Sequence, residues 1–444
     1  MIRSMIERGC RVGFFGLGRS NLSLIKSLPL KNCSVTLRSD GSIDPSILPG
    51  ARIMSGERAT EDISEDILFL SPSVRRERFQ GYPGVILSSD YELFLEENNA
   101  SLFAVTGSDG KSSTARLLRL LLTEAGHRAT EIGNMGVPMY ENIGSADIFV
   151  AELSSFMLSA ALPKANVSAL TSLSPNHLDW HGDYENYKKT KIDLLKASEK
   201  YVISDENSDV KGAYGIVSLK SSFANLMRSY PAELYLTAED GYILKNGERL
   251  IPLAEIKRRE EHNLKNLMLA TAMADGYWDR DVILRVARTF EGLSHRCEHF
   301  LSARGVDYFD SSIDTSPTRT ATTLRSLNRT AVVILGGRSK GLDYSLMLRE
   351  LRDYGAAAVL VGENKYDILS AIGGALPCYI AEDFAHATDL GIKLARDVGA
   401  LLLSPASASY DMFADYKSRG ETFKKLVRKG IRNEENLSRQ QRDD

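Results

Sequence analysis

The sequence contains few cysteines, and their spacing suggests neither a zinc site nor a disulfide framework. Only four of the 444 residues are cysteine, at positions 10, 33, 297 and 378, and no two of them are spaced as CxxC. Zinc sites and disulfide-rich folds need closely spaced or numerous cysteines. We therefore expect buried or idle thiols.

Long apolar runs and an excess of charge are also missing. No stretch approaches the ~20 apolar residues that cross a bilayer, and the opening MIRSMIERGCRVGFFGLG lacks the apolar core and cleavage site of a signal peptide. The formal net charge of −3 gives no reason to expect binding to nucleic acid or to a membrane surface. These absences predict a cytoplasmic protein.

The composition that remains is that of an ordinary globular protein, with 43% apolar and 25% charged residues. The length allows about three domains of ~150 residues, and strand and helix signals alternate in three stretches, as in layered α/β proteins. We expect domains over 1–98, 99–293 and 294–444. Residues 292–300 form either a hinge or a plain surface turn, and 430–444 form a solvated or disordered tail.

A glycine-rich turn near residue 110 predicts phosphate binding. In AVTGSDGKSSTARLLRLLL (104–122), an apolar strand ends in a turn that leads into a leucine-rich helix. Gly107 and Gly110 allow backbone N–H groups to approach an anion. Lys111 supplies a positive charge, and the hydroxyl of Ser112 can hold Mg²⁺. Val105 occupies the first glycine position of the usual G-x-x-x-x-G-K-[ST] spacing, so a turn without phosphate is the alternative.

A second glycine turn, in FFGLGRSNLSL (14–24), is similar but less complete. Gly16 and Gly18 follow a strand and precede a helix, whereas Asn21 occupies the third glycine position of a dinucleotide fold. No acidic residue ends the next strand, which carries Leu37 and Arg38 there, so a nicotinamide enzyme is weakly supported. The turn either receives a diphosphate at the helix N-terminus or is only a tight connection.

Polar residues follow two further strands of the central stretch. Glu152 ends the strand in ADIFVAELSSF, where a parallel sheet presents side chains to a ligand crevice, and its carboxylate suits Mg²⁺. Asn176 and His177 lie in a turn, and Lys191 follows on an expected helix. The alternatives are a surface charge for Glu152, a satisfied loop histidine for His177 and a solvated charge for Lys191.

Six fragments in a fixed order make the chain resemble the Mur ligase family, ATP-dependent enzymes that form amide bonds in peptidoglycan synthesis. They are TGSDGKSS, ELSSF, SPNHLDWHGDYENYKKTK, EEHNLKN, GLSHRCE and SPASASYDMFADYKSRGETF. The resemblance covers nearly the whole chain. ELSSF and SPASASYDMF look most like the branch that adds D-glutamate, and a complete domain before the phosphate loop suits that branch.

The resemblance implies three α/β domains: an N-terminal Rossmann-like domain for a UDP-sugar, a central P-loop ATPase-like domain with a mostly parallel sheet, and a C-terminal Rossmann-like domain for the amino acid. It also implies a monomer that uses ATP and Mg²⁺ at two sites, with UDP-N-acetylmuramoyl-L-alanine and D-glutamate as substrates and no nucleic acid or membrane partner. ATP would phosphorylate the substrate carboxylate, and the amine of the amino acid would attack the acyl phosphate.

The resemblance also assigns residues to ATP and metal. The implied ATP contacts are Gly107, Ser108, Asp109, Gly110, Lys111, Ser112, Ser113, Asn263, Asn266, Arg296 and Asp310. The implied catalytic residues are Lys111, Glu152, His177 and Lys191, and the implied metal ligands are Ser112, Glu152, His177 and Lys191. Lys191 occupies a position that CO₂ carbamylates in the family, which replaces an ammonium by a carboxylate-like ligand.

A further set of residues is implied to bind the two substrates. The contacts to the UDP-sugar and its alanine are Gly18, Arg19, Ser20, Arg38, Ser73, Asn134, Ser154 and Ser155, and those to D-glutamate are Thr315, Lys340, Ser409 and Tyr416. The chain departs from common family forms in three places. Ile313 and Ser316 replace a lysine and an asparagine in the loop after Asp310, and Ser73 replaces a glycine near the uracil.

Two alternatives remain beside a D-glutamate ligase. One is a related ligase with another amino acid or UDP precursor, which the D-glutamate contacts would distinguish. The other is a non-catalytic nucleotide-binding paralogue, which has no chemical need to keep the four implied catalytic residues.

Overall fold

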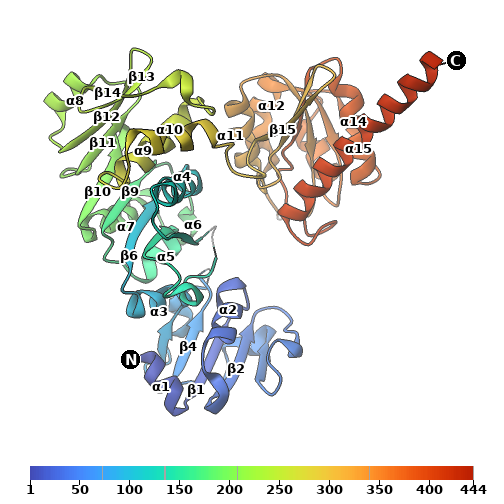
Figure 1. Ribbon diagram of the computed structural model, residues 1–444. Helices are drawn as coiled ribbons and strands as arrows, with labels where there is room; N and C mark the ends of the chain where they lie inside the picture. Colours follow the sequence, from blue (N-terminus) through green and yellow to red (C-terminus); the bar gives the residue numbers. More distant parts are fainter. Residues whose placement is uncertain (73, 135–136, 208, 340, 444) are drawn as a thin grey trace. The chain divides into compact units, whose positions relative to one another are not determined.

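The structure, a computed structural model, describes residues 1–72, 74–134, 137–207, 209–339 and 341–443. The chain forms two compact units, Met1–Phe290 and Glu291–Asp444 (Figure 1). Three mostly parallel sheets with flanking helices confirm the predicted α/β class. The sheets fall within the three expected ranges, but the division into three domains remains a prediction. Within the described part of the chain, no helix is long and apolar enough to cross a membrane.

The first sheet is parallel throughout, with its five strands in the order β3-β2-β1-β4-β5. They are β1 (Arg11–Phe15), β2 (Ser34–Ser39), β3 (Arg52–Ser55), β4 (Ile67–Leu70) and β5 (Ile86–Ser88), and the helices are α1 (Ile2–Arg8), α2 (Arg19–Ser27) and α3 (Asp90–Glu97). Strands β2 and β4 lie on opposite sides of β1, so the order of the strands reverses at β1. Ligands of open α/β sheets bind at such a switch point, at the carboxyl ends of the strands.

The second sheet holds nine strands in the order β14-β13-β12-β11-β10-β9-β6-β8-β7. They are β6 (Ser101–Thr106), β7 (Ala129–Gly133), β8 (Ile148–Glu152), β9 (Val167–Leu170), β10 (Lys200–Ser204), β11 (Gly215–Ser218), β12 (Leu234–Glu239), β13 (Tyr242–Lys245) and β14 (Glu248–Pro252). Strand β13 pairs antiparallel with both β12 and β14, and a tight turn at Asn246-Gly247 joins β13 to β14. Both turn residues have positive φ, as this hairpin turn requires.

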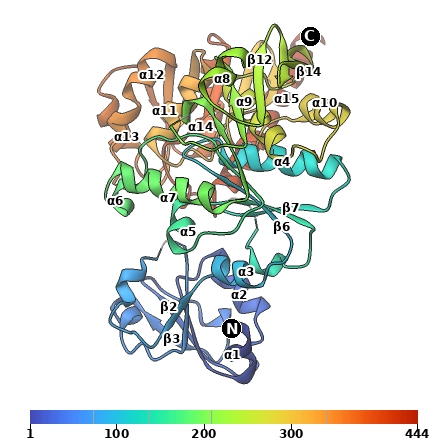
Figure 2. The ribbon, with the colours of Figure 1, turned by 90° about the vertical axis from the view of Figure 1, so that its left-hand side faces the viewer.

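Helices cover both faces of the second sheet because its central strands carry apolar side chains on both faces. Phe103 and Val105 of β6 pack with α4 (Lys111–Glu124), α9 (Glu261–Met273) and α10 (Arg280–Thr289), which Figure 2 shows together. Leu102 and Ala104 face the opposite way, toward α3, α5 (Ser155–Ala160) and α7 (Tyr184–Ala197). Two shorter helices, α6 (Leu178–His181) and α8 (Phe223–Ser229), complete this unit.

The second unit contains a six-stranded sheet in the order β15-β16-β20-β17-β18-β19, in which only β15 and β16 pair antiparallel among the described strands. Its strands are β15 (Glu298–Ala303), β16 (Val306–Asp310), β17 (Ala331–Leu335), β18 (Gly355–Leu360), β19 (Cys378–Ile380) and β20 (Ala400–Leu403). One face packs on α14 (Phe384–Ala395) and α15 (Tyr416–Asp443), and the other on α11 (Pro317–Leu327), α12 (Leu348–Tyr354) and α13 (Lys365–Ile372).

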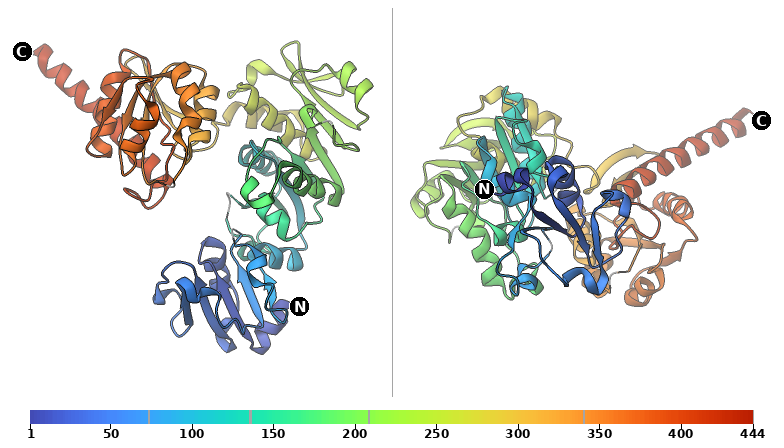
Figure 3. Two further views of the ribbon diagram at one scale, coloured as in Figure 1. Left: turned by 180° about the vertical axis from the view of Figure 1, so that it is seen from behind. Right: turned by 90° about the horizontal axis from the view of Figure 1, so that it is seen from below.

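The end of the chain, for which the sequence predicts a solvated or disordered tail, is helical. The last helix, α15, continues through 430–443 and extends past the sheet of its own unit (Figure 3). Phe423, Val427 and Ile431 bury one side of its first half against α14 and the sheet. The helix therefore starts on a packed face, and its polar second half continues the same helical geometry.

Candidate functional site

The turn between β6 and α4 requires glycine at both predicted positions. Gly107 has φ 146° and Gly110 has φ 85°, conformations that other residues rarely adopt. A Cβ atom on Gly107 would lie 2.0 Å from Oγ1 of Thr171, and one on Gly110 would lie 2.6 Å from Oδ1 of Asn266. Glycine is therefore needed at both positions for two reasons: the backbone has a positive φ, and a side chain would clash with a neighbouring residue.

Lys111 is the first residue of α4, and its side chain folds back over the turn. Its Nζ donates hydrogen bonds to the carbonyl oxygens of Gly107 and Ser108, both at 2.8 Å. The backbone N–H groups at this helix N-terminus are the kind of donors that bind phosphate oxygens. Ser112 and Ser113 are buried just behind them, whereas Asp109 is exposed at the tip of the turn.

Glu152 lies at the carboxyl end of β8, on the strand next to β6. The residue is 1% exposed, and its Oε1 accepts a hydrogen bond from Nδ2 of Asn134 at 3.0 Å. The second oxygen, Oε2, is buried and has no hydrogen-bond partner among the described residues. A buried carboxylate oxygen without a partner is energetically costly, and a divalent cation is a natural partner for it.

Lys191 lies on α7, 80 residues after Lys111 in the sequence. Its side chain is nevertheless buried beside the phosphate loop. Its Nζ donates to the carbonyl oxygen of Gly107 at 3.0 Å and to Oγ1 of Thr106 at 3.3 Å. Burial and the charge of Lys111 hold the pKa of Lys191 well below its usual value, although Glu152 acts in the opposite direction. The amine is therefore easier to deprotonate than that of an exposed lysine.

His177 precedes α6 in a left-handed conformation with φ 53°. Its ring lies against Phe156 of α5, with ring centroids 4.8 Å apart. The same helix begins at Ser154, whose Oγ accepts the N–H of Met157 at 3.3 Å, and Ser155 is buried. The structure thus places His177 beside the helix that carries the two predicted serines.

Asn263 and Asn266 lie on the first turns of α9, and both are buried. Asn266 accepts a hydrogen bond from Oγ1 of Thr114 at 3.2 Å and lies against Gly110, so it borders the phosphate loop. Asn263 donates to Oε2 of Glu260 at 2.9 Å. The structure therefore brings Asn266 to the loop itself.

A cavity of about 100 Å³ joins the first glycine turn to the central sheet. Arg19 and Ser20 from the start of α2 line it together with Gly133 and Asn134 after β7. Gly18 caps α2 and is exposed at the same turn. The predicted contacts Arg19, Ser20 and Asn134, separated by over a hundred residues in the chain, thus share one cavity.

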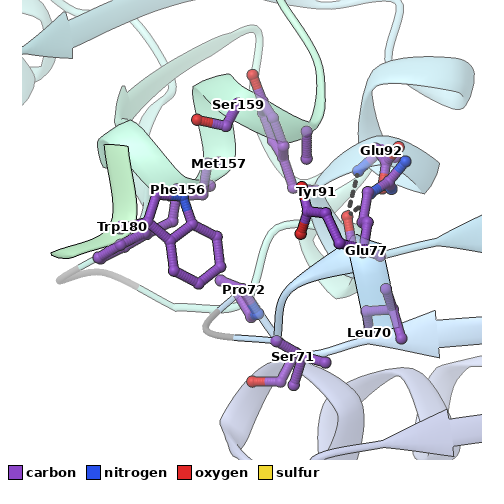
Figure 4. A pocket seen from close by; sticks show the side chains of 14 residues that line it. Leu70, Ser71, Pro72, Glu77, Tyr91, Glu92, Phe156, Met157, Ser159 and Trp180 are labelled. Atoms are coloured by element: carbon purple, nitrogen blue, oxygen red, sulfur yellow. Dashed lines mark hydrogen bonds and ion pairs between the residues drawn. The ribbon is translucent and has the colours of Figure 1, made fainter. Parts of the chain in front are cut away.

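A second cavity, of about 80 Å³, lies next to the first and shares Pro72, Tyr91 and Met157 with it. Figure 4 shows Trp180 and Phe156 on one side of this aromatic cavity and Tyr91 on the other. The guanidinium carbon of Arg75 lies 5.0 Å from the centre of the Trp180 ring. These aromatic residues carried no functional signal in the sequence, because a Phe or Trp in a helix is usually part of the core.

Arg38 does not fit its predicted contact with the uridine. It is fully buried, and its guanidinium makes five hydrogen bonds, two to the carboxylate of Glu65 and three to the carbonyl oxygens of Ala59, Glu61 and Asp62. An arginine has five N–H donors, so none is left for a ligand. The prediction is corrected: Arg38 holds the 59–65 segment against β2.

The side chain of Asp310, like that of Arg38, is engaged inside the protein. It is fully buried at the end of β16, with Oδ2 2.7 Å from Nδ1 of His295 and Oδ1 accepting the N–H of Ser312 at 2.9 Å. A carboxylate engaged in this way does not support the predicted contact with ATP.

The remaining predicted residues of the second unit lie on loops and at a helix start: Thr315 follows β16, Ser409 follows β20, and Tyr416 begins α15. Ser409 is buried, and Thr315 and Tyr416 are half-buried, with the Tyr416 ring centroid 6.1 Å from that of His295. Arg296 lies in the turn before β15. The predictions for Ser73 and Lys340 lie outside the described residues.

Asp90 is a functional candidate that the sequence analysis missed. Its carboxylate lines the cavity with Arg19 and accepts the N–H groups of Met139 at 2.8 Å and Tyr140 at 3.1 Å. Burial, partly offset by these hydrogen bonds, raises the pKa of Asp90 to about 6. An acidic residue at a helix start usually reads as a helix-dipole partner, so the sequence carried no signal of this second role.

Comparison with known proteins gives a consistent assignment. The model of the Mur ligase middle domain matches residues 105–274. The UDP-N-acetylmuramoylalanine–D-glutamate ligase of Clostridium novyi is 30% identical, over 95% of this chain and 97% of the relative, and that of Clostridium kluyveri is 31% identical, over 94% and 96%. The structure of UDP-N-acetylmuramate–alanine ligase from Thermotoga maritima has a TM-score of 0.62 at 16% identity, covering 95% of this chain and 99% of that one. At that identity, the structural similarity concerns the fold.

Proposed function

Because the chain belongs to the Mur ligase family of ATP-dependent ligases, we propose that it joins D-glutamate to UDP-N-acetylmuramoyl-L-alanine, with release of ADP and phosphate. The relatives that are about 30% identical over nearly their whole length carry this name. The observation that carries the proposal is the convergence of Lys111, Lys191 and Glu152 at one phosphate-type turn.

Phosphoryl transfer depends on positioning and charge neutralisation more than on a protein nucleophile. The loop amides and Lys111 bind the β- and γ-phosphates of ATP in this proposal, and Asn266 supports the loop from α9. The substrate carboxylate then attacks the γ-phosphorus, the bond to the β-phosphate oxygen breaks, and ADP leaves. The amine of D-glutamate attacks the acyl carbon of the resulting acyl phosphate, loses a proton, and expels phosphate as the amide forms.

The donors present fit a divalent cation. The partnerless Oε2 of Glu152 and the hydroxyl of Ser112 would hold one Mg²⁺ near the loop. His177 and a carbamylated Lys191 would hold a second. Mg²⁺ supplies positive charge that neutralises the phosphate oxygens during transfer. Asn134 keeps the Glu152 carboxylate oriented through its hydrogen bond to Oε1.

The proposal includes carbamylation of Lys191, and the surroundings of this side chain support it. The lowered pKa leaves a fraction of the amine neutral, and a neutral amine is the form that attacks CO₂. The ammonium first gives up one proton to become the neutral amine. The nitrogen then forms a C–N bond as one C=O π bond of CO₂ opens to an oxyanion, and it loses a second proton to solvent, so the group changes from a cation to an anion. That change removes the repulsion between Lys191 and Lys111 and creates a carboxylate-like ligand.

The substrate sites follow from the cavities and loops. The diphosphate binds at the start of α2 with Arg19 and Ser20, and the muramoyl-alanine extends toward Asn134 and Ser154. Thr315, Ser409 and Tyr416 of the second unit contact D-glutamate. The proposal also includes a monomeric, cytoplasmic enzyme with three domains.

The test is ADP and phosphate release measured over a panel of UDP-muramoyl precursors and L- and D-amino acids. Release that requires both UDP-N-acetylmuramoyl-L-alanine and D-glutamate is the expected result. A preference for another amino acid or precursor would assign a different member of the family. Release that is independent of any acceptor, or no release at all, would contradict a ligase function.

A further inference from the structure

The segment 133–142, which begins at the last residue of β7, is fixed at its first end to Glu152. A Cβ atom on Gly133 would lie 2.5 Å from the carbonyl oxygen of Glu152, so glycine allows this approach. The N–H of Asn134 donates to the same carbonyl oxygen at 3.0 Å, and its Nδ2 donates to Oε1 of the side chain at 3.0 Å. Asn134 therefore holds both the backbone and the carboxylate of Glu152. Residues 135 and 136 lie outside the described part of the chain.

Helix α3 fixes the other end of the segment, mainly through Asp90. Oδ2 of Asp90 accepts the N–H of Met139 at 2.8 Å, and Oδ1 accepts the N–H of Tyr140 at 3.1 Å. The hydroxyl of Tyr140 donates to Oε2 of Glu97, on the same helix, at 3.2 Å. Met139 and Tyr140 are both buried. Three hydrogen bonds thus attach this end of the segment to α3.

Hydrogen bonds inside the segment connect its two ends. The N–H of Gly133 donates to the carbonyl oxygen of Val137 at 3.1 Å. Nδ2 of Asn142 donates to the carbonyl oxygen of Pro138 at 2.7 Å, and the N–H of Asn142 donates to that of Met139 at 3.2 Å. A displacement of Met139 would therefore be transmitted to the first end of the segment.

The buried carboxylate of Asp90 is not needed to begin α3. Oγ of Ser89 accepts the N–H of Glu92 at 3.2 Å and donates to its Oε2 at 2.8 Å, so Ser89 already caps the helix. A favourable interaction with the helix dipole is available to an exposed carboxylate as well, whereas Asp90 is only 4% exposed. Burial disfavours the charged form and raises the pKa of Asp90 to about 6. The two hydrogen bonds to the 139–140 backbone offset part of this cost.

We propose that Asp90 is a positioning residue for Glu152. By binding the 139–140 backbone, it keeps the segment in the form in which Asn134 donates to Oε1 of Glu152. Oε2 then stays available to a divalent cation. The proposal rests on the proposed function, since it assumes a cation at Glu152. Asp90 and Asn134 also line one cavity, so this positioning couples the proposed sugar-nucleotide site to the proposed metal site.

A double-mutant cycle with a metal readout tests the proposal. The affinity for Mn²⁺, in the presence of a non-hydrolysable ATP analogue, is measured by electron paramagnetic resonance for wild type, Asp90→Ala, Asn134→Ala and the double variant. We expect each single variant to weaken Mn²⁺ binding about 10-fold. The double variant should bind no more weakly than the weaker single variant, because residues that act through one set of contacts are not additive.

Matched variants separate positioning from loss of fold and from a substrate contact. Glu96 is exposed on α3, so Glu96→Gln should leave the Mn²⁺ affinity unchanged. Asp90→Asn keeps one acceptor oxygen and should lose less affinity than Asp90→Ala, which it replaces in the cycle if the alanine variant does not fold. In a Glu152→Gln background, Asp90→Ala should have no further effect. The titrations contain no sugar nucleotide, so a direct contact between Asp90 and that substrate does not contribute.

Each outcome decides the positioning role. Additive effects in the cycle, an unchanged Mn²⁺ affinity in a folded Asp90→Ala protein, or an equal loss in the Glu152→Gln background would overturn it. The titration requires no acceptor, so the cycle still decides this role if ADP release proves independent of acceptors and the proposed ligase function fails. A wild type that bound no Mn²⁺ with the analogue would overturn the cation site and this inference together.

Discussion

The two glycine turns of the first unit have the same local plan but different surroundings. Both follow a parallel strand and begin a helix, at α2 and at α4. The α2 turn is braced from inside by Asn21, whose Nδ2 donates to the carbonyl oxygens of Phe15, Gly16 and Phe69 at 2.8–3.3 Å. The α4 turn is instead wrapped by two lysine side chains, those of Lys111 and Lys191.

The side chains around the two turns suit them to different tasks, ligand binding at α2 and phosphoryl transfer at α4. A turn braced by a neutral amide keeps its shape and offers helix N–H groups, which suffices to hold a diphosphate. A turn that also gathers two lysines and a buried carboxylate can neutralise charge that develops during transfer. The backbone motif is thus common to both turns, and the side chains around the α4 turn are the ones that suit the proposed phosphoryl transfer.

The largest effect should come from removing the lysine of the α4 turn. Lys111→Ala should lower ADP release by about 10³-fold or more, because a charge that stabilises the transition state is lost. The exposed Arg116 of the same helix provides the control, and Arg116→Ala should keep near-normal turnover. Steady-state ADP release and a thermal melt measure both. Near-normal turnover in a folded Lys111→Ala protein would remove the distinction between the two turns.

The next effect concerns the second lysine. Lys191→Ala should be about 10²- to 10³-fold slower and partly rescued by short-chain carboxylic acids that replace the carbamate. The exposed Lys189 lies on the same helix, and Lys189→Ala should neither slow the enzyme nor respond to added acids. Rates are compared with and without acetate at fixed ionic strength. Full activity of Lys191→Ala without any acid would contradict the proposed metal ligand.

A substitution in the α2 turn should weaken binding of the UDP-sugar without slowing the chemical step. Arg19→Ala should raise the KM of the UDP-sugar about 10-fold and leave kcat and the KM of ATP close to wild type, because it contributes to ground-state binding. Lys26→Ala, an exposed change at the other end of α2, is the control. Initial rates over both substrates test this split. A fall in kcat alone would place Arg19 in the chemical step and abolish the contrast.

The last effect concerns stability and not turnover, and it is a pH dependence near the first turn. Because burial raises the pKa of Asp90 to about 6, the folded protein binds its proton more tightly than the unfolded chain does. The stabilisation is complete below pH ~4 and is lost as the pH rises through 6, a change of roughly 2–3 kcal/mol in the free energy of unfolding. Urea unfolding from pH 4 to 8 should show this fall in wild type and a smaller one in Asp90→Asn. Identical slopes would exclude Asp90 as the titrating group.

Local patterns predicted the elements that carry the site. The glycines and apolar runs of 14–24 and 104–122 indicated two strand–turn–helix units, and Glu152 was placed at its strand end, because these signals lie within a few residues of each other. Short strands such as β3 and β19, with three or four residues, carried too little periodicity to be recognised.

Contacts between distant segments could not be predicted from local patterns. The partner of Arg38 is Glu65, 27 residues away, so the sequence presented Arg38 as a strand-end charge available to a ligand. Lys191 read as a solvated lysine because its burial depends on the packing of α7 against α5 and β9, which local sequence does not reveal. The resemblance supplied the importance of Lys191, and the structure supplies a physical reason for it.

The shared wall between the two cavities has a consequence for chemical inhibition. Among the residues that the structure describes, both cavities share Pro72, Tyr91 and Met157, and Met157 is a flexible side chain that changes rotamer at low cost. A fragment anchored on Trp180 and Phe156 can therefore be linked past Met157 to an anionic head group at Arg19. If the sugar nucleotide binds at Arg19 as proposed, such a two-headed compound would compete with it and would gain further contacts from Trp180 and Phe156.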